Sequence, residues 1–176
     1  GIDSVKYDVI VCPHCGYGAL SRFFSYMTTH QAKLIHDNIS VNFKGLAPTG
    51  DTYTYDDAIT RYKLALLNTV VKKAKVSERA YTCLKLAWLY RGKAENLKPD
   101  EADYAKKKEE CAKAEKEMLA NAYEGFMMSV SKENFPICGM DETTLDYLMA
   151  NLAKQIGKID EASRIVSRIL VSKTAN

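Results

Sequence analysis

Two cysteines separated by a dipeptide, Cys12-Pro13-His14-Cys15, are the residues of this chain whose types and spacing most directly suggest chemistry. Thiolates at this spacing bind zinc as half of a four-ligand site. They also form redox-active dithiols when a strand delivers them to the start of a helix. The two chemistries imply different functions. The secondary structure predicted on either side of the pair therefore decides which of the two chemistries is favoured.

A thiol-disulfide oxidoreductase would use Cys12 as the nucleophile and Cys15 as the resolving thiol. The residues from Lys6 to Val11 indicate a short strand, and apolar spacing predicts a helix from Ala19 to about Ile35, which is the local order found in thioredoxin-like enzymes. That fold also needs later strands and a cis-proline facing the dithiol. The later prolines instead fall in predicted loops: Pro48, Pro99 and Pro136.

A structural zinc site needs four ligands, and Cys12 and Cys15 supply two of them from a knuckle whose tight turn is permitted by Gly16. His30 and His36 lie on or just after the next predicted helix, so they would contribute only if that helix folded back. We therefore expect the second pair of ligands upstream of Gly1. The cofactor expected is zinc in a longer form of the protein.

Composition predicts an all-α protein. The chain has 176 residues, of which 47% are hydrophobic and 27% charged, which is enough for a domain with a core. It contains 9 Gly and 4 Pro, and alanine, leucine, lysine and glutamate dominate its later part. The net charge of +3 is not concentrated in a basic block, which argues against nucleic-acid binding. We expect a cytoplasmic protein without a membrane span.

Helical spacing continues after residue 50. A ladder of small and large side chains from Tyr55 to Leu66 predicts one helix, and Ser77-Glu78 is expected to cap the next, with the two forming an antiparallel hairpin. A long helix is expected from Ala102 to about Val130. Residues 141–172 are expected to form another helical hairpin, divided at Gly157.

The segment from Gly157 to Ala162 has the turn-and-alanine spacing of the tetratricopeptide repeat, and about two and a half such units fit the chain. The fold class expected is therefore all-α, with tetratricopeptide-like helical hairpins in a right-handed solenoid or bundle, a short N-terminal strand and a cysteine knuckle. Residues 1–50 would hold the knuckle and the first helix, and residues 51–176 the helical domain, within one compact unit. An irregular bundle in which the ladders merely pack is the alternative.

A helical repeat predicts a concave binding groove. By repeat spacing its lining residues would be Tyr81, Trp88, Arg91, Tyr147, Asn151 and Lys154. Aromatic side chains there would supply apolar area, and the polar ones would hold a backbone or a carboxylate, although Trp88 is equally explained by core packing. Phosphate-loop, zinc-protease and nucleophile-elbow motifs are missing from the sequence, so we expect a non-catalytic module that binds a peptide or protein partner.

The segment from Tyr7 to Tyr17, followed by these helices, resembles the bacterial family called domain of unknown function 2225. The resemblance extends over residues 55–66, 86–92 and 145–170. It implies a zinc-ribbon-like head completed by an earlier Cys-x-x-Cys, which this sequence lacks, and it implies no activity. Beside the binding module, the oxidoreductase and a zinc-ribbon nucleic-acid binder stay open, although only Arg22 and Lys33 supply positive charge just after the knuckle.

Overall fold

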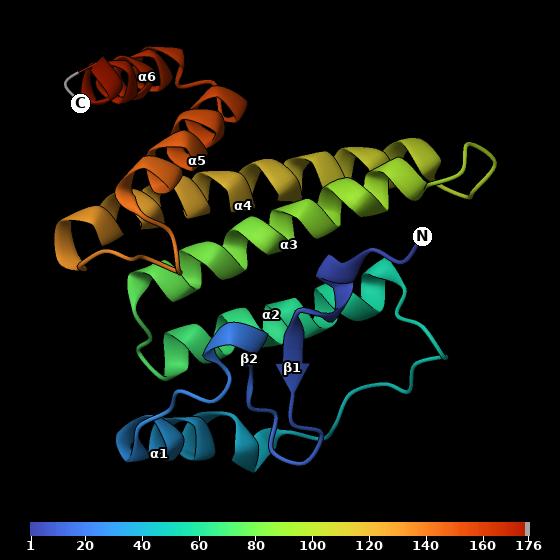
Figure 1. Ribbon diagram of the computed structural model, residues 1–176. Helices are drawn as coiled ribbons and strands as arrows, with labels where there is room; N and C mark the ends of the chain where they lie inside the picture. The colour runs from blue at the N-terminus through green and yellow to red at the C-terminus, as the bar shows by residue number, and fades with distance from the viewer. Residues whose placement is uncertain (175–176) are drawn as a thin grey trace.

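The computed structural model describes residues 1–174, which are mostly helical with one short antiparallel hairpin of strands at the N-terminal end (Figure 1). The strands are β1 (Val9–Val11) and β2 (Gly18–Leu20). The α-helices are α1 (Thr29–Asn38), α2 (Tyr55–Val71), α3 (Val76–Asn96), α4 (Tyr104–Lys132), α5 (Glu142–Gln155) and α6 (Ile159–Thr174). Short 3-10 turns cover Ser4–Tyr7, Ser21–Phe23 and Ser40–Asn42.

The elements are stacked in chain order. Helix α2 lies between the β-hairpin and α3, and α3 forms the longest antiparallel pair with α4 (Figure 1). Helix α5 packs on α4, and α6 packs on α5. The predicted helical character of residues 51–174 is therefore confirmed, including the helical hairpin formed by α5 and α6.

Small residues bring α3 and α4 close together. A Cβ atom added to Gly125 would lie 2.7 Å from the Cβ of Ala80, so the two helices touch at this crossing. Leu84 of α3 and Phe126 of α4 are buried beside it, in the larger hydrophobic cluster, which continues into α5 and α6. Burial of these side chains is the main contribution to the stability of the helical array.

A second cluster joins the N-terminal segment to this array. Val9 and Leu20 of the hairpin pack with Tyr62 of α2 and Leu89 of α3. The Tyr62 hydroxyl donates a hydrogen bond of 2.6 Å to the carbonyl oxygen of Val5, and burial raises the pKa of this phenol. The β-hairpin is therefore fixed against α2 and α3.

The helix predicted from Ala19 to Ile35 is wrong over its first half. Gly18–Leu20 form β2, in which Leu20 pairs with Val9, and α1 begins only at Thr29. Pairing with β1 places Leu20 in the core under α2, and the capping box of Thr28 and Gln31 sets the later helix start. The strand predicted from Lys6 is also shorter than expected, because Ser4–Tyr7 form a 3-10 turn.

The predicted N-cap at Ser77-Glu78 is also wrong. Helix α3 starts at Val76, and Ser77 and Glu78 are buried inside its first turn. The carboxylate of Glu133, which follows α4, accepts hydrogen bonds from the Ser77 backbone N–H (3.1 Å) and hydroxyl (2.6 Å). A residue distant in sequence therefore takes the role expected of a local cap.

Candidate functional site

The cysteine pair lies in the turn between β1 and β2 and not at the start of a helix. The backbone N–H of Cys12 donates to the Tyr17 carbonyl (2.8 Å), and that of Gly16 donates to the Cys12 carbonyl (3.1 Å). Gly16 has a φ of +75°, which favours glycine. Hairpin pairing on one side and this tight turn on the other fix the positions of Cys12 and Cys15.

Backbone donors make the two sulfur atoms inequivalent. Hydrogen bonds from the N–H groups of His14 and Cys15, with a further one from the Cys15 side chain, lower the pKa of Cys12. Burial raises the pKa of Cys15, and the neighbouring Cys12 raises it further, although the N–H of Tyr17 acts in the opposite direction. A turn that directs N–H groups at sulfur stabilises the thiolate, which is the form that binds metals and attacks disulfides.

Further metal ligands are not gathered around this pair. Within residues 1–174, no group of three or more Cys, His, Asp or Glu side chains could hold a metal ion. His36 lies exposed on α1 with its Nδ1 atom 3.0 Å from Asp37, and His30 is exposed on the same helix. The structure thus offers Cys12 and Cys15 as a pair of thiols that fits half of a four-ligand site.

Buried polar contacts connect the turn to α2. The side-chain amide of Asn68 donates to the Gly16 carbonyl (3.0 Å), while its own Oδ1 atom is buried without a partner among the described residues. The Lys72 ammonium lies 5.5 Å from the centre of the Tyr17 ring and forms an ion pair of 2.7 Å with Glu78 at the start of α3. This chain of contacts leads from the cysteine turn to a cleft on the neighbouring surface.

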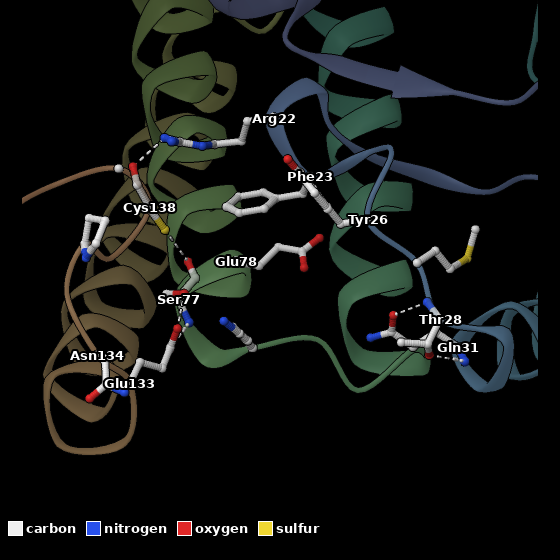
Figure 2. A pocket seen from close by; sticks show the side chains of 14 residues that line it. Arg22, Phe23, Tyr26, Thr28, Gln31, Ser77, Glu78, Glu133, Asn134 and Cys138 are labelled. Atoms are coloured by element: carbon white, nitrogen blue, oxygen red, sulfur yellow. Dashed lines mark hydrogen bonds between the residues drawn. The ribbon is translucent and has the colours of Figure 1, made fainter.

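The cleft has a volume of about 660 Å³ and lies between three segments far apart in sequence (Figure 2). One wall comes from residues 22–31, one from residues 75–78 and one from residues 133–139. Its lining combines apolar and polar side chains: Arg22, Phe23, Tyr26, Met27, Thr28, Gln31, Lys75, Ser77, Glu78, Glu133, Asn134, Pro136, Cys138 and Gly139. Tyr26 is 77% exposed, so a large aromatic surface at this cleft is free of intramolecular packing.

Hydrogen bonds fix the walls of the cleft to one another. The Arg22 guanidinium reaches across and donates to the Cys138 carbonyl (Figure 2). Cys138 (φ +50°) and Gly139 (φ +76°) form a tight turn closed by the paired Ile137 and Met140. The Cys138 thiol donates to the Ser77 carbonyl at 3.5 Å, and burial raises its pKa to about 11, so this sulfur is a protonated structural group.

The residues of the predicted groove are only partly brought together. Arg91 donates to Glu115 (2.7 Å) and to Gln155 (2.6 Å), and Gln155 in turn donates to Asn151. Arg91 and Asn151 are thus linked, through contacts made within the protein. Lys154 lies exposed on α5, the helix that also carries Asn151.

The aromatic members of the predicted groove also make contacts within the protein. Trp88 is half-buried against the larger hydrophobic cluster, in agreement with core packing. Tyr147 accepts a hydrogen bond of 2.8 Å from Lys173 of α6. The Tyr81 ring lies 6.4 Å from that of Phe126, with the Arg22 guanidinium 5.7 Å from its centre. Tyr81 therefore belongs to the surroundings of the cleft.

Sequence reasoning missed the cleft itself. The sequence indicates Arg22 only as a charge near the knuckle, and it indicates the segment holding Cys138 only as a loop between helices. The two residues are separated by 116 positions, so local spacing carries no signal of their contact. The sequence signals that exist are Pro136 and Gly139, which mark a turn, and the acidic Glu78 and Glu133 at helix ends.

Comparison with known protein families gives a match. A family model described as "Uncharacterized protein conserved in bacteria (DUF2225)" matches residues 1–176. No curated protein and no solved structure matches the chain. Among the described residues, the helices are too short or too polar to cross a membrane.

Proposed function

The chain belongs to the DUF2225 family along its whole length, and from its geometry we propose that it is a non-catalytic module that binds a peptide segment of a protein partner. The peptide would bind in the cleft between the N-terminal segment, α3 and the α4–α5 connection. The observation that carries this proposal is the cleft of about 660 Å³ with its preformed walls. A cavity of roughly 300–1,000 Å³ is typical of ligand sites in proteins.

The lining of the cleft suits a peptide. Phe23, Tyr26, Met27 and Pro136 offer apolar area, and polar groups such as Gln31 lie between them. The hydrogen bond from Arg22 to Cys138 holds opposite walls in place before a ligand arrives, which reduces the entropy lost on binding. We place the peptide in this cleft in preference to the groove predicted from repeat spacing, because Arg91 of that groove is engaged by Glu115 and Gln155.

The helices and the cysteine turn have supporting roles in this proposal. The hairpins of α3 with α4 and of α5 with α6 act as a tetratricopeptide-like scaffold. Cys12 and Cys15 contribute two thiolate ligands to a structural zinc site, and a bound zinc ion would stabilise the β-hairpin. The location that goes with this proposal is the cytoplasm, where a reducing environment keeps such thiols free of disulfides.

A library of random peptides displayed on phage tests the binding function. We expect the wild-type protein to enrich peptides whose binding is lost in the cleft variant Tyr26→Ala/Met27→Ala. The matched variant Tyr147→Ala removes an exposed tyrosine from α5 and should retain the same peptides. Enrichment of no peptide, or of peptides that bind the cleft variant equally well, would refute the proposal, with circular dichroism confirming that both variants are folded.

The second candidate is a thiol-disulfide oxidoreductase, which is favoured by the lowered pKa of Cys12 beside the raised pKa of Cys15. In such a reaction the Cys12 thiolate attacks a substrate disulfide and releases one thiolate, and Cys15 then displaces the second while a Cys12–Cys15 disulfide forms. Incubation of the reduced protein with a model disulfide measures this reaction. A rate equal to that of the Cys12→Ser variant would exclude it.

A further inference from the structure

We infer that the ligand of the cleft is an acidic peptide, in which aspartate or glutamate residues are interspersed with apolar ones, and that Arg22 and Lys75 meet its carboxylates. This inference rests on the proposed binding function and adds the chemical class of the ligand. It follows from which of the charged groups lining the cleft are already paired within the protein.

Both carboxylates of the cleft are engaged. Glu78 is buried and forms the 2.7 Å ion pair with Lys72, which lies behind the cleft wall. Glu133 accepts two hydrogen bonds from Ser77, one from the backbone N–H and one from the hydroxyl. The Glu78 charge is therefore balanced by Lys72, whereas Glu133 is bonded, among the described residues, only to neutral groups of Ser77 and keeps its negative charge.

Both cations of the cleft lack such a partner. Among residues 1–174, neither Arg22 nor Lys75 takes part in an ion pair with a carboxylate. The contact of Arg22 with Cys138 is a hydrogen bond to a neutral carbonyl, and it leaves other N–H donors of the guanidinium available. With Glu78 balanced by Lys72, the cleft holds the two cations against the single carboxylate of Glu133, so its net charge is positive and favours an anionic ligand.

The guanidinium of Arg22 is held in place for this role. It lies 5.5 Å from the centre of the Phe23 ring and 5.7 Å from that of Tyr81, so two aromatic rings support it. It also lies directly over Gly139, where an added Cβ would be 2.5 Å from its Nη2 atom. A fixed planar guanidinium binds a carboxylate through paired hydrogen bonds.

The surroundings of Arg22 favour a peptide over a nucleic acid as the source of the anionic groups. Met27 and Pro136 present apolar surface on two walls, which suits peptide side chains. The unpaired Glu133 carboxylate in the same cleft would repel a continuous phosphate backbone, whereas isolated carboxylates can be placed next to the two cations.

The test uses fluorescence anisotropy with three fluorescein-labelled pools of short synthetic peptides. Every second position is a mixture of Phe, Leu and Met, and the remaining positions are Asp and Glu in one pool, Asn and Gln in the second, and Lys and Arg in the third. A labelled single-stranded oligonucleotide is the fourth probe. We expect the acidic pool to bind most tightly, with an affinity that falls as salt is added.

Variants connect this preference to the cleft. Arg22→Gln should weaken binding of the acidic pool about tenfold, and Arg22→Lys, which keeps the charge, should weaken it less. Arg164→Gln removes an exposed arginine from α6 and should have no effect. Thermal unfolding followed by circular dichroism confirms that each variant is folded. If Arg22→Gln does not fold, the Arg22→Lys variant still tests the role of the guanidinium.

Every other result overturns the inference. Equal or tighter binding of the neutral or basic pool, tighter binding of the oligonucleotide, or equal losses in Arg22→Gln and Arg164→Gln would show that the ligand class is wrong. Binding of a neutral or basic pool that Tyr26→Ala/Met27→Ala abolishes would leave the proposed function standing. Failure of all the pools to bind would count against both.

Discussion

Lys72 and Glu78 form a buried ion pair at the boundary between α2 and α3, with 2.7 Å between Nζ and Oε1 and side chains that are 1% and 11% exposed. The pair lies between the two candidate sites. Lys72 also faces the ring of Tyr17, which follows the cysteine turn, and Glu78 lines the cleft. Both candidate sites therefore lie next to this pair.

Breaking this pair should destabilise the protein strongly. Lys72→Met leaves the Glu78 carboxylate, and Glu78→Gln leaves the Lys72 ammonium, without its partner in a buried position, which costs about 3–5 kcal/mol. The double variant Lys72→Met/Glu78→Gln removes both charges and should be less destabilised than the sum of the single variants. Urea unfolding measures the three free energies. Strictly additive effects would show that the two side chains do not interact.

The crossing of α3 and α4 depends on Gly125. In Gly125→Ala the new methyl group would be 2.7 Å from the Cβ of Ala80, and we expect this overpacking to cost about 1–3 kcal/mol, less the gain in helix propensity. Adding Ala80→Gly makes room for the methyl group and should restore part of the loss. Thermal unfolding of the single and double variants checks this. A Gly125→Ala protein as stable as the wild type would mean that the helices are not in contact there.

The sequence was most informative where structure is decided locally. The ladder from Tyr55 to Leu66 predicted α2. The hairpin predicted over residues 141–172 begins as expected, with Asp141 capping α5 by accepting a hydrogen bond of 2.8 Å from the Thr144 N–H. These features depend on residues a few positions apart, so periodicity and capping rules detect them.

Features that depend on distant partners were missed. Leu20 has helical spacing with its neighbours, yet pairing with Val9 makes it part of a strand. The cleft depends on the contact of Arg22 with Cys138, which are far apart in sequence. Lys72 is buried, although it belongs to a lysine-rich run that gives no local sign of burial. Tertiary contacts override local preference at these positions. The Cys12 and Cys15 pair was recognised from sequence, whereas its β-hairpin setting was not.

Acid should weaken the attachment of the N-terminal segment through Asp8. Burial acts to raise the pKa of Asp8, but hydrogen bonds from Lys85 and Ser21 outweigh it and hold the pKa below the ordinary 3.8. A carboxyl whose pKa is lower in the folded state stabilises the fold above its unfolded pKa, and this contribution disappears as pH falls through the folded pKa. The stability advantage of the wild type over Asp8→Asn should therefore be present at neutral pH.

Urea unfolding at neutral pH and at about pH 3 measures this advantage. We expect the difference in unfolding free energy between the wild type and Asp8→Asn to shrink at the lower pH. A difference that stays constant would show that the Asp8 carboxylate does not contribute through its contacts with Lys85 and Ser21. Lys85→Met should reduce the pH dependence in the same way as Asp8→Asn, because it removes the ammonium that holds the pKa down.

Substitutions at Gly139 and Gly157 distinguish the effect of backbone strain from the effect of displacing Arg22. Gly139→Ala and Gly157→Ala both put a side chain at a positive φ, +76° and +86°, and each should cost about 1–2 kcal/mol of stability. The new methyl group at position 139 would also displace the Arg22 guanidinium, whereas an added Cβ at position 157 meets no atom within 4 Å. Both variants should therefore lose similar stability in thermal unfolding, but only Gly139→Ala should lose affinity for the acidic peptide pool, by up to about tenfold. Equal affinities in the two variants would show that the position of Arg22 over this turn does not matter for binding.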